Sequence, residues 1–300
     1  MRIVSLLPSA TEIICELGLD DQLVGVSHEC DYPIGVEQLP RVTSSVIPKN
    51  VASADIDRLV REHLQDNASL YLLDLELLEK LAPDLIVTQA LCDVCAVSSD
   101  DVEAAVHALP SRPAVVNLEP SQLEDVFRTI ERVGAAAAVP RVARNLVTEL
   151  GSRIQAVVER TAKVTNHPKV VFLEWIDPPF SAGHWTPELI EFAGGIDCLG
   201  NAGSPSRTLQ WSEIVAAQPD VLIAACCGFD ADRTAQDADI LARQAGWNEL
   251  PCVQAGRVVY LDGNAYFNRP GPRLVDSLEL LAHHLHPDIH RFPVTGSGPR

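Results

Sequence analysis

The apolar residues of the chain form two kinds of pattern, short near-continuous runs and stripes at helical spacing. The runs are Ile3 to Leu7, Leu23 to Val26, Leu85 to Thr88, Ala114 to Leu118, Val170 to Trp175, Val221 to Ala225 and Val258 to Leu261. Such runs are typical of strands that are buried on both faces. Because helical stripes separate most of them, the pattern predicts an α/β fold with parallel sheets.

Start signals accompany several of the predicted helices. Ser9 and Glu12 have the spacing of a capping box, and Asp74 precedes an apolar stripe as an N-cap would. Pro140 suits the first turn of another helix. The stripe that follows it continues at four-residue spacing to Val158, so this helix is predicted to be about 30 Å long at 1.5 Å per residue.

Two alternations of strands and helices are separated by a purely helical middle section. The predicted division is an N-terminal α/β lobe over 1–120, linker helices over 121–166, a C-terminal α/β lobe over 167–290 and a flexible tail over 291–300. A helix end, Pro-Asp and an aliphatic strand recur at corresponding points of the two halves. We therefore expect two related parallel-sheet lobes that are joined by a long rigid helix.

The charge composition argues against two classes of partner. The 41 acidic residues outnumber the 23 basic ones, and the resulting negative field disfavours nucleic acid and anionic membrane surfaces as partners. No apolar run approaches the ~20 residues that span a bilayer. The run after Arg2 stops at Pro8, which is too short for a secretory signal, so we expect a cytoplasmic protein whose eight cysteines are mainly reduced.

Several separated motifs resemble one known family. They are Val26-Ser27 leading to Asp31-Tyr32-Pro33, Pro178-Pro179-Phe180 leading to Gly183, Ala193-Gly194-Gly195, and Phe267-Asn268-Arg269 before Pro272-Arg273. In this order they resemble the substrate-binding proteins of ABC transporters whose two α/β lobes are joined by a helix. This family carries cobalamin, haem and iron-siderophores, and the sequence is most similar to its cobalamin-binding members.

The resemblance implies a cleft between the lobes in which aromatic side chains hold a corrin, a broad apolar disc. The residues expected to contact the ligand are Asp31, Tyr32, Gln89, Trp175, Phe180, His184, Trp185, Trp211, Gly228, Phe229, Tyr266 and Phe267. The family docks on its transporter through one glutamate of each lobe. Glu76 matches in the first lobe, whereas Ser212 occupies the second position, so docking on an ABC transporter is doubtful.

A cysteine and histidine group adds candidate metal chemistry. His28, Cys30, Cys92 and Cys95 all lie in loops of the first lobe that follow predicted strands. Together they would suit a tetrahedral zinc site, or one of them would suit an axial bond to cobalt. Ordinary reduced cysteines are the alternative interpretation. His63 lies on the apolar stripe of its helix and is expected to be a core histidine.

These features favour a binding protein over an enzyme. Neither a phosphate-binding loop nor a nucleophile elbow occurs in the sequence. The leading hypothesis is a cytosolic corrinoid-binding protein that stores, salvages or hands over its small-molecule ligand. The alternatives are a zinc or iron enzyme or redox protein centred on His28 and the three cysteines, and a haem or iron-siderophore binder of the same fold.

Overall fold

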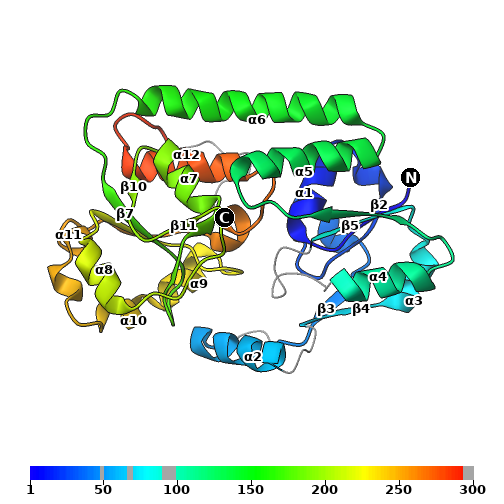
Figure 1. Cartoon of the computed structure of the whole chain (residues 1–300), viewed down its shortest axis with the longest axis horizontal. Coiled ribbons are helices and arrows are strands. Elements are labelled where there is room, and N and C mark those ends of the chain that lie inside the picture. The colour runs from blue at the N-terminus through cyan, green and yellow to red at the C-terminus, as the bar shows by residue number, and fades with distance from the viewer. Residues whose placement is uncertain (48–50, 66–69, 90–98, 293–300) are drawn as a thin grey trace. The chain divides into compact units, whose positions relative to one another are not determined.

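The computed structural model describes residues 1–47, 51–65, 70–89 and 99–292 (Figure 1). The chain forms two compact units. Lobe 1 comprises Met1–Pro120 with Glu124–Thr148, and lobe 2 comprises Ser121–Leu123 with Glu149–Arg300. The helices that were predicted as a separate linker are thus divided between the lobes. Among the described helices, none is both long enough and apolar enough to cross a membrane.

Lobe 1 is built on a four-stranded parallel sheet. Its strands, in spatial order, are β2 (Leu23–Val26), β1 (Ile3–Ser5), β5 (Leu85–Gln89) and β6 (Ala114–Leu118). The helices of this part of the chain are α1 (Pro8–Glu16), α3 (Leu75–Leu81), α4 (Ser99–Ala108) and α5 (Leu123–Ala136). Val4, Leu78 and Ile86 are fully buried in one shared cluster, which explains the continuous apolar runs of β1 and β5.

A two-stranded ribbon outside this sheet is a feature that the sequence patterns did not predict. It pairs β3 (Thr43–Ser45) with β4 (Tyr71–Leu73) in antiparallel register, with Ser44 opposite Leu72. Helix α2 (Ser53–Gln65) lies between the two strands in the sequence. None of the described apolar side chains of α2 is buried, so the expectation that His63 is a core histidine is wrong.

Lobe 2 repeats the plan of lobe 1. Its parallel strands, in spatial order, are β10 (Ile196–Asp197), β7 (Lys169–Trp175), β12 (Val221–Ala224) and β13 (Val258–Tyr260). Strand β8 (Phe180–Ser181) adds to β7 in antiparallel register, and β9 (Gly183–His184) pairs with β11 (Asn201–Ala202). The helices are α7 (Thr186–Phe192), α8 (Trp211–Ala217), α9 (Ala231–Gln236), α10 (Ala238–Ala242), α11 (Pro251–Gln254) and α12 (Leu274–Leu285).

The repeat between the lobes extends to individual hydrogen bonds. Ala82 and Gln218 end their helices in the left-handed conformation, at φ 41° and 46°, and Pro-Asp follows each. The Asp84 carboxylate accepts from the Arg2 N–H at 2.7 Å, and the Asp220 carboxylate accepts from the Lys169 N–H at 2.8 Å. Each Pro-Asp therefore fixes the start of its strand to the first strand of its own sheet. The predicted kinship of the two lobes is confirmed.

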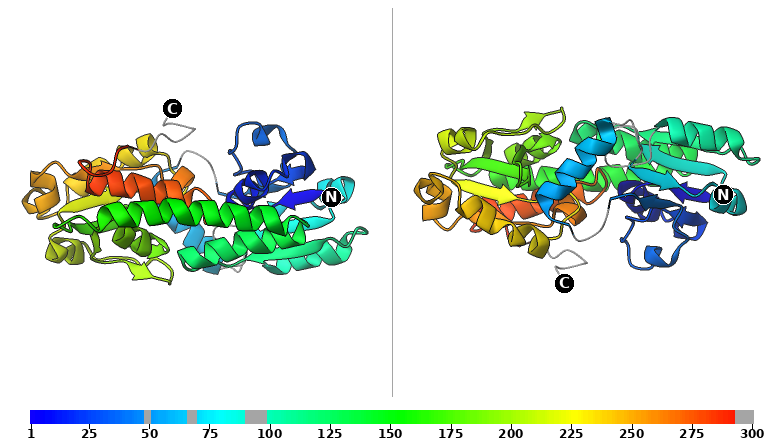
Figure 2. Two further views of the ribbon diagram at one scale, coloured as in Figure 1. Left: turned by 90° about the horizontal axis from the view of Figure 1, so that it is seen from above. Right: turned by 90° about the horizontal axis from the view of Figure 1, so that it is seen from below.

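Helix α6 (Pro140–Thr161) begins at the predicted proline and belongs to lobe 1 up to Thr148 and to lobe 2 from Glu149. At 1.5 Å per residue its 22 residues span about 33 Å. Helix α12 runs beside its second half (Figure 2), where the Arg153 guanidinium pairs with Asp276 and, at 2.8 Å, with Glu279. The predicted long helix is confirmed.

Two of the predicted helix starts have different outcomes. The Asp74 side chain accepts from the Leu77 N–H at 2.9 Å, so the predicted N-cap of α3 is confirmed. Helix α1 instead begins at Pro8, with Leu7 as a cap that makes no side-chain hydrogen bond. The capping box at Ser9 and Glu12 is therefore wrong, because a proline in the first turn places both residues inside the helix.

Candidate functional site

Because the main strands of each sheet are parallel, their carboxyl ends lie together at one edge. In open α/β sheets ligands bind beyond the carboxyl ends of the strands. In lobe 1 this edge carries the turn after β2, at 27–30, and Gln89 at the end of β5. In lobe 2 it carries the segments after β7, β12 and β13. Most of the predicted ligand residues lie in these segments, so each edge is described in turn.

Arg41 binds both ends of the 27–30 turn of lobe 1. One guanidinium nitrogen, Nη1, donates to the Ser27 carbonyl at 2.8 Å and to the Cys30 carbonyl at 2.6 Å. The Cys30 N–H also donates to the Ser27 carbonyl at 3.2 Å. Hydrogen bonds from a charged donor are roughly twice as strong as neutral ones, so Arg41 fixes both ends of the turn. Arg41 therefore positions His28 and Glu29.

The His28 imidazole is oriented by Thr43. The Thr43 hydroxyl donates its single proton to Ser27 Oγ at 3.1 Å and lies 2.7 Å from His28 Nδ1. Nδ1 must therefore supply the proton of that bond, which leaves the lone pair of a neutral ring on Nε2. In this tautomer Nε2 is the ring nitrogen whose lone pair can bind a metal. His28 Nε2 lies 3.9 Å from a Glu29 oxygen, and the ring packs 5.1 Å from the ring of Tyr71.

Cys30 is placed differently from His28, although the two residues are close in the sequence. Its thiol is 1% exposed and lies 3.0 Å from the Thr11 hydroxyl. The Thr11 hydroxyl donates its proton to Ser5, and the Ser5 hydroxyl donates to the Leu7 carbonyl. Because the Thr11 proton is already used, the Cys30 thiol is the donor in its bond to Thr11. A protonated, buried thiol is a poor metal ligand. These bonds make Cys30 part of a hydrogen-bond network in lobe 1.

The remaining predicted residues of lobe 1 fall into three groups. Asp31 is exposed and Tyr32 is half-buried, whereas Gln89 is 5% exposed within the sheet. Cys92 and Cys95 lie outside the described residues. Among the residues that the structure does describe, no three histidine, cysteine or acidic side chains gather as a metal site. The predicted four-residue zinc site stays a prediction.

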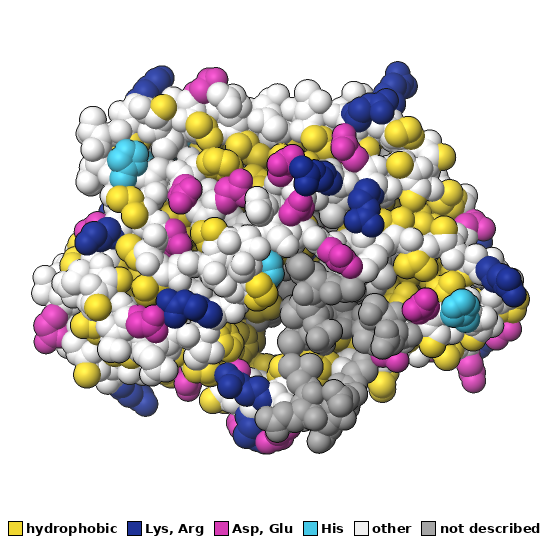
Figure 3. All heavy atoms as spheres, in the orientation of Figure 1, with side chains coloured by type: hydrophobic (Ala, Val, Ile, Leu, Met, Phe, Trp, Pro, Cys, Tyr) yellow, Lys and Arg dark blue, Asp and Glu magenta, His cyan; other side chains and the backbone are white. Residues whose placement is uncertain are grey.

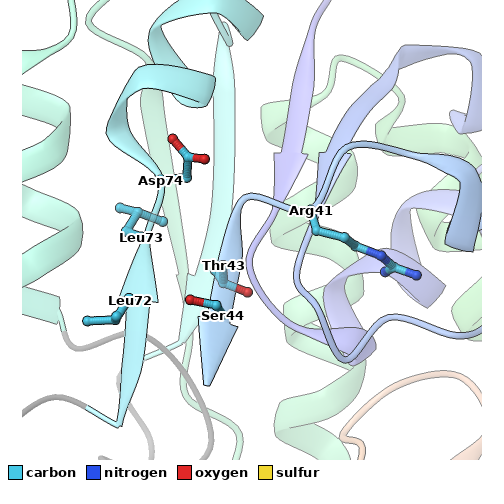
Figure 4. Close-up of a pocket in the computed structure, with 6 residues that line it drawn as sticks. All are labelled: Arg41, Thr43, Ser44, Leu72, Leu73 and Asp74. Atoms are coloured by element: carbon cyan, nitrogen blue, oxygen red, sulfur yellow. The ribbon is translucent and has the colours of Figure 1, made fainter. Parts of the chain in front are cut away.

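One cavity of about 160 Å³ opens beside the β3–β4 ribbon. It is lined by Arg41, Thr43, Ser44, Leu72, Leu73 and Asp74 (Figure 4). Its polar groups already bond to the protein: Arg41 and Thr43 hold the 27–30 turn, and Asp74 caps α3. In Figure 4 the Arg41 guanidinium points away from the other side chains. The volume is also below the ~300 Å³ at which small-molecule pockets begin.

The edge of lobe 2 carries packed aromatic rings. Trp175 ends β7 and its ring lies 5.0 Å from that of Phe229, which follows β12. The Arg233 guanidinium lies 4.1 Å from the centre of the Phe229 ring. Trp175 also donates its indole N–H to the Asp177 carbonyl at 2.9 Å. Contacts with a second ring and with a cation restrict the orientation of an aromatic ring. The Phe229 ring is therefore a rigid apolar surface.

A second aromatic group lies deeper in lobe 2. Trp185 donates its indole N–H to the Phe267 carbonyl at 2.9 Å, and the His184 ring stacks on it at 5.3 Å. The Phe267 ring is 1% exposed and packs against Phe172 in the core. Burial lowers the pKa of His184, so this imidazole is neutral at pH 7. Of the three predicted residues here, only His184 has substantial exposed surface.

The other predicted residues of lobe 2 are less closely associated. Phe180 is half-buried on β8 opposite Trp175, and Gly228 is exposed at φ 72° in the turn before Phe229. Tyr266 is half-buried in the π-helical turn Gly263–Phe267. Trp211 packs on Trp247 and donates to the Ala245 carbonyl at 2.7 Å. The structure thus gives Trp211 a packing role within its own lobe.

Glu174 is a half-buried residue at this edge that the sequence analysis missed. It accepts from the Gly183 N–H at 2.9 Å, next to His184. Burial raises its pKa to about 7, while the hydrogen bond from Gly183 acts in the opposite direction. A glutamate inside the otherwise apolar run of β7 was the signal that could have found it. Arg41, Thr43 and Tyr71 carried no comparable signal, since the ribbon was not predicted.

The surface is charged without a single dominant patch on the face seen in Figure 3. Acidic and basic side chains are interspersed there, and apolar side chains show between them. The negative net charge therefore does not mark a binding site on this face.

Comparison with known proteins decides the family. The family model described as periplasmic binding protein matches residues 3–265. The chain belongs to this family. Members of the family bind solutes and are not enzymes, so a small-molecule binding function is supported and the enzyme alternative does not fit. One relative, the vitamin B12-binding protein of Vibrio cholerae, is 25% identical over 287 residues, which cover 95% of this chain and 88% of that protein.

Solved structures of the family share the two-lobe fold. The periplasmic haem-binding protein RhuT of Roseiflexus sp. RS-1, in its apo form, aligns with a TM-score of 0.71 at 23% identity over 95% of this chain and 98% of that one. The periplasmic vitamin B12-binding protein BtuF of Vibrio cholerae aligns with a TM-score of 0.66 at 23% identity over 95% and 96%. The fold class predicted from the sequence is confirmed.

Proposed function

We propose that the protein binds a metal-centred tetrapyrrole, and that a corrinoid such as cobalamin is its preferred ligand. The observation that carries the proposal is the match with a vitamin B12-binding protein across 95% of the chain. The edge of lobe 2 supports it, because the half-buried Phe229 ring, packed on the buried Trp175, offers flat, rigid apolar surface, which suits a broad ring at little cost in side-chain entropy. The predicted cleft between the lobes stays a prediction.

The proposed corrinoid contacts divide into two kinds. His28 is the proposed ligand to the metal, because Thr43 fixes the required tautomer. Tyr32, Phe180, Phe229 and Tyr266 are proposed to contact the ring, because each is partly exposed near the carboxyl edge of its lobe. Cys30, Trp211 and Phe267 are left out of this set, since the structure explains them by packing and hydrogen bonds.

Haem is the second candidate ligand. The haem-binding RhuT aligns over 95% of this chain, and a neutral imidazole in the His28 tautomer also suits haem iron. The two ligands differ at their rims, because haem carries anionic propionates and cobalamin carries neutral amides. A protein with a net charge of −18 repels the dianion more than the amide-fringed ring, which favours the corrinoid.

A competition experiment separates the two ligands. The full chain is incubated with equimolar hydroxocobalamin and hemin, desalted, and assayed by visible absorption against each ligand alone. We expect the corrin bands to be retained at about one per chain and hemin to be washed out. Retention of hemin in preference to hydroxocobalamin would reverse the order of the candidates, and loss of both would refute the proposal.

A cytoplasmic location and a role in storage or hand-over remain part of the proposal. In lobe 2 the position that would hold a docking glutamate is the exposed Ser212, and the neighbouring Glu213 already pairs with Arg207 at 2.9 Å. A transporter would thus find its expected carboxylate only at Glu76 of lobe 1. Fractionation of cells that express the native gene tests the location: the protein should be found in the cytoplasm, and recovery with the membrane or envelope would contradict the proposal.

A further inference from the structure

His184 is a residue of the lobe 2 edge that the proposed ligand contacts leave out. It is the last residue of β9 and adopts the left-handed conformation, at φ 48°. Its N–H donates to the Ser204 carbonyl at 2.7 Å, and its carbonyl accepts from the Gly203 N–H at 2.9 Å. Residues other than glycine rarely adopt this conformation, and those that are held in it cluster at functional sites. The backbone thus fixes a histidine at a position where glycine would be less strained.

Contacts on both sides of His184 place it at the carboxyl edge of lobe 2. The preceding residue, Gly183, donates its N–H at 2.9 Å to the carboxyl group of Glu174, which lies at the carboxyl end of β7. The following residue, Trp185, donates its indole N–H at 2.9 Å to the carbonyl of Phe267, in the turn after β13. His184 is therefore anchored to the ends of two strands of the sheet.

The turn after β13 also joins His184 to the proposed ring contacts. The Asn264 N–H of this turn donates to the Phe229 carbonyl at 3.1 Å, and Tyr266 lies in the same turn. Phe180 precedes His184 in the chain, on β8. A tetrapyrrole that contacts these aromatic rings would therefore have its rim within reach of the segment that carries His184.

The His184 ring has a packing partner but no hydrogen-bond partner among the described residues. It is half-buried and stacks on the Trp185 ring at 5.3 Å. Burial is the one cause that lowers its pKa, and no described group hydrogen-bonds to either ring nitrogen. The His28 ring, in contrast, is held by Thr43. Because metal-binding histidines almost always have such a partner on the second nitrogen, the surroundings of His184 favour a hydrogen bond to a ligand over a bond to a metal.

The charges around His184 favour an uncharged partner. Three arginines that follow β12 and β13 are paired or buried: Arg233 pairs with Asp237 at 3.2 Å, and Arg269 and Arg273 are 5% and 8% exposed. The His184 imidazole is itself neutral at pH 7, since burial lowers its pKa, and it has one donor and one acceptor. A carboxylate placed against it would lose water without gaining an opposite charge, which is costly. A carboxamide would not incur this cost.

We infer that His184 is a specificity-determining residue of the ligand site: its imidazole hydrogen-bonds to a carboxamide at the rim of the ligand and selects an amide-fringed tetrapyrrole over one that is fringed by carboxylates. This inference rests on the proposed function and adds to it a residue and a class of rim group. His28 stays the proposed ligand to the metal. Removal of the His184 ring should therefore change affinity without changing the surroundings of the metal.

The test is equilibrium dialysis of the full chain against two corrinoids that share one ring and one metal. Diaquacobinamide carries carboxamides at its rim, and diaquacobyrinic acid carries carboxylates there. We expect the wild type to bind diaquacobinamide more tightly. His184→Gly removes the ring and accepts the left-handed backbone without strain. It should weaken the binding of diaquacobinamide by about three- to tenfold, that of the acid by less than about twofold, and leave the visible band of the bound corrin unchanged.

The matched control is His107→Ala, which changes an exposed histidine in the last turn of α4 and should match the wild type. A shifted band in His184→Gly would make His184 a metal ligand and overturn the inference. Preference of the wild type for the acid, or for hemin dialysed in parallel, would also overturn it. If the wild type binds neither the corrinoids nor hemin, the proposed function itself fails. If it binds diaquacobinamide and His184→Gly binds it equally, only the role of His184 is refuted.

A second variant, His184→Asn, separates hydrogen bonding from packing. Asparagine tolerates the left-handed conformation and keeps a donor and an acceptor, so it should recover part of the affinity that glycine loses. The apo melting temperatures of both variants should stay within about 2 °C of the wild type, because relief of backbone strain offsets the lost stacking on Trp185. A drop of several degrees, or an asparagine variant that binds no better than the glycine variant, would show that His184 acts by packing and would contradict the inference.

Discussion

The two lobes share one framework and differ at the edge where ligands bind. Both have four parallel strands in the same order, with a left-handed helix end and Pro-Asp that ties the sheet to its first strand. In lobe 1 the edge is polar, and Thr43 and Arg41 orient a histidine by hydrogen bonds. In lobe 2 the edge is aromatic and its rings are locked by neighbours. The framework is repeated, and the chemistry lies in the loops.

This difference suggests a division of labour. In the proposed function, the polar edge of lobe 1 supplies the coordinating group His28, whereas the aromatic edge of lobe 2 supplies shape and apolar surface. Rigidity in lobe 2 comes from packing, so a side-chain atom added there should strongly lower the stability of the protein. Orientation in lobe 1 comes from a few hydroxyl bonds, so its loss should affect binding more than folding. Four variants test this contrast.

The largest effect on stability is expected from Gly263→Ala in lobe 2. An added Cβ would lie 2.6 Å from the Ala225 carbonyl oxygen and even closer to that of Cys226, so the backbone after β13 must move. Overpacking costs about 1–3 kcal/mol, which should lower the melting temperature by roughly 5 °C. The control is Gly151→Ala in α6, where a Cβ meets nothing within 4 Å and alanine stabilises the helix. An unchanged melting temperature for Gly263→Ala would show that this edge is not rigid.

The next effect is a pH dependence at Glu174. Burial raises the folded-state pKa of this carboxyl from 4.5 to about 7, so the folded protein binds more protons than the unfolded chain between these values. Its contribution to stability is therefore lost as pH rises through this window. Glu174→Gln cannot ionise and should melt about 2–4 °C higher than the wild type at pH 8, with no difference near pH 4.

Thermal melts of Glu174→Gln at both pH values are compared with those of Glu149→Gln, which changes an exposed glutamate of α6. The melting temperature of the control should not differ from that of the wild type in this pH-dependent way. A Glu174→Gln variant that is less stable than the wild type at pH 8 would mean that the ionised carboxylate is the stabilising form, contrary to the account.

A smaller effect on stability is expected from Thr43→Val in lobe 1. The substitution removes the hydroxyl that bonds to His28 Nδ1 and Ser27, at a cost of about 1 kcal/mol. Because the imidazole then loses its fixed orientation, ligand affinity should fall by about tenfold. Thr148→Val, on the exposed side of α6, should change neither quantity. If Thr43→Val binds as tightly as the wild type, hydroxyl orientation of His28 is unimportant.

The smallest effect is expected from a histidine cluster in lobe 2, away from its carboxyl edge. His167 and His286 both donate to the Gly194 carbonyl, at 3.0 and 3.1 Å. Burial, with His167 and Arg257 adding repulsion, lowers the pKa of His286, so its contribution to stability is complete above about pH 6.5 and is lost as pH falls. His286→Gln stays neutral and should lose less stability than the wild type between pH 7 and 5. Equal slopes in thermal melts would contradict this.

The sequence predicted the framework better than the site. Strands such as β5 (Leu85–Gln89) lie where the apolar runs placed them, because burial on both faces leaves a continuous apolar pattern. The ribbon of β3 and β4 was missed, since Thr43–Ser45 is too short and too polar to show a strand pattern. His28 was found from its place after a strand. Its partner Thr43 was not, because spatial pairing across the ribbon leaves no trace in local spacing.

The aromatic residues show the same limit. Their position after strands indicated the edge of lobe 2, but which rings are buried depends on packing that residue type does not reveal. Phe267 and Phe229 have the same side chain and both follow strands, yet Phe267 is packed against Phe172 and Phe229 is half-exposed under Arg233. Glu174 was predictable only as a chemical exception within the apolar pattern of β7.

The measurement that tests the central claim most directly is equilibrium dialysis of the full chain against hydroxocobalamin under reducing, anaerobic conditions, with corrin and protein quantified after equilibration. The account predicts saturable binding of one corrin per chain, with a visible band shift that decreases in His28→Ala. Corrin concentrations that stay equal on the two sides of the membrane at every ligand concentration would contradict it.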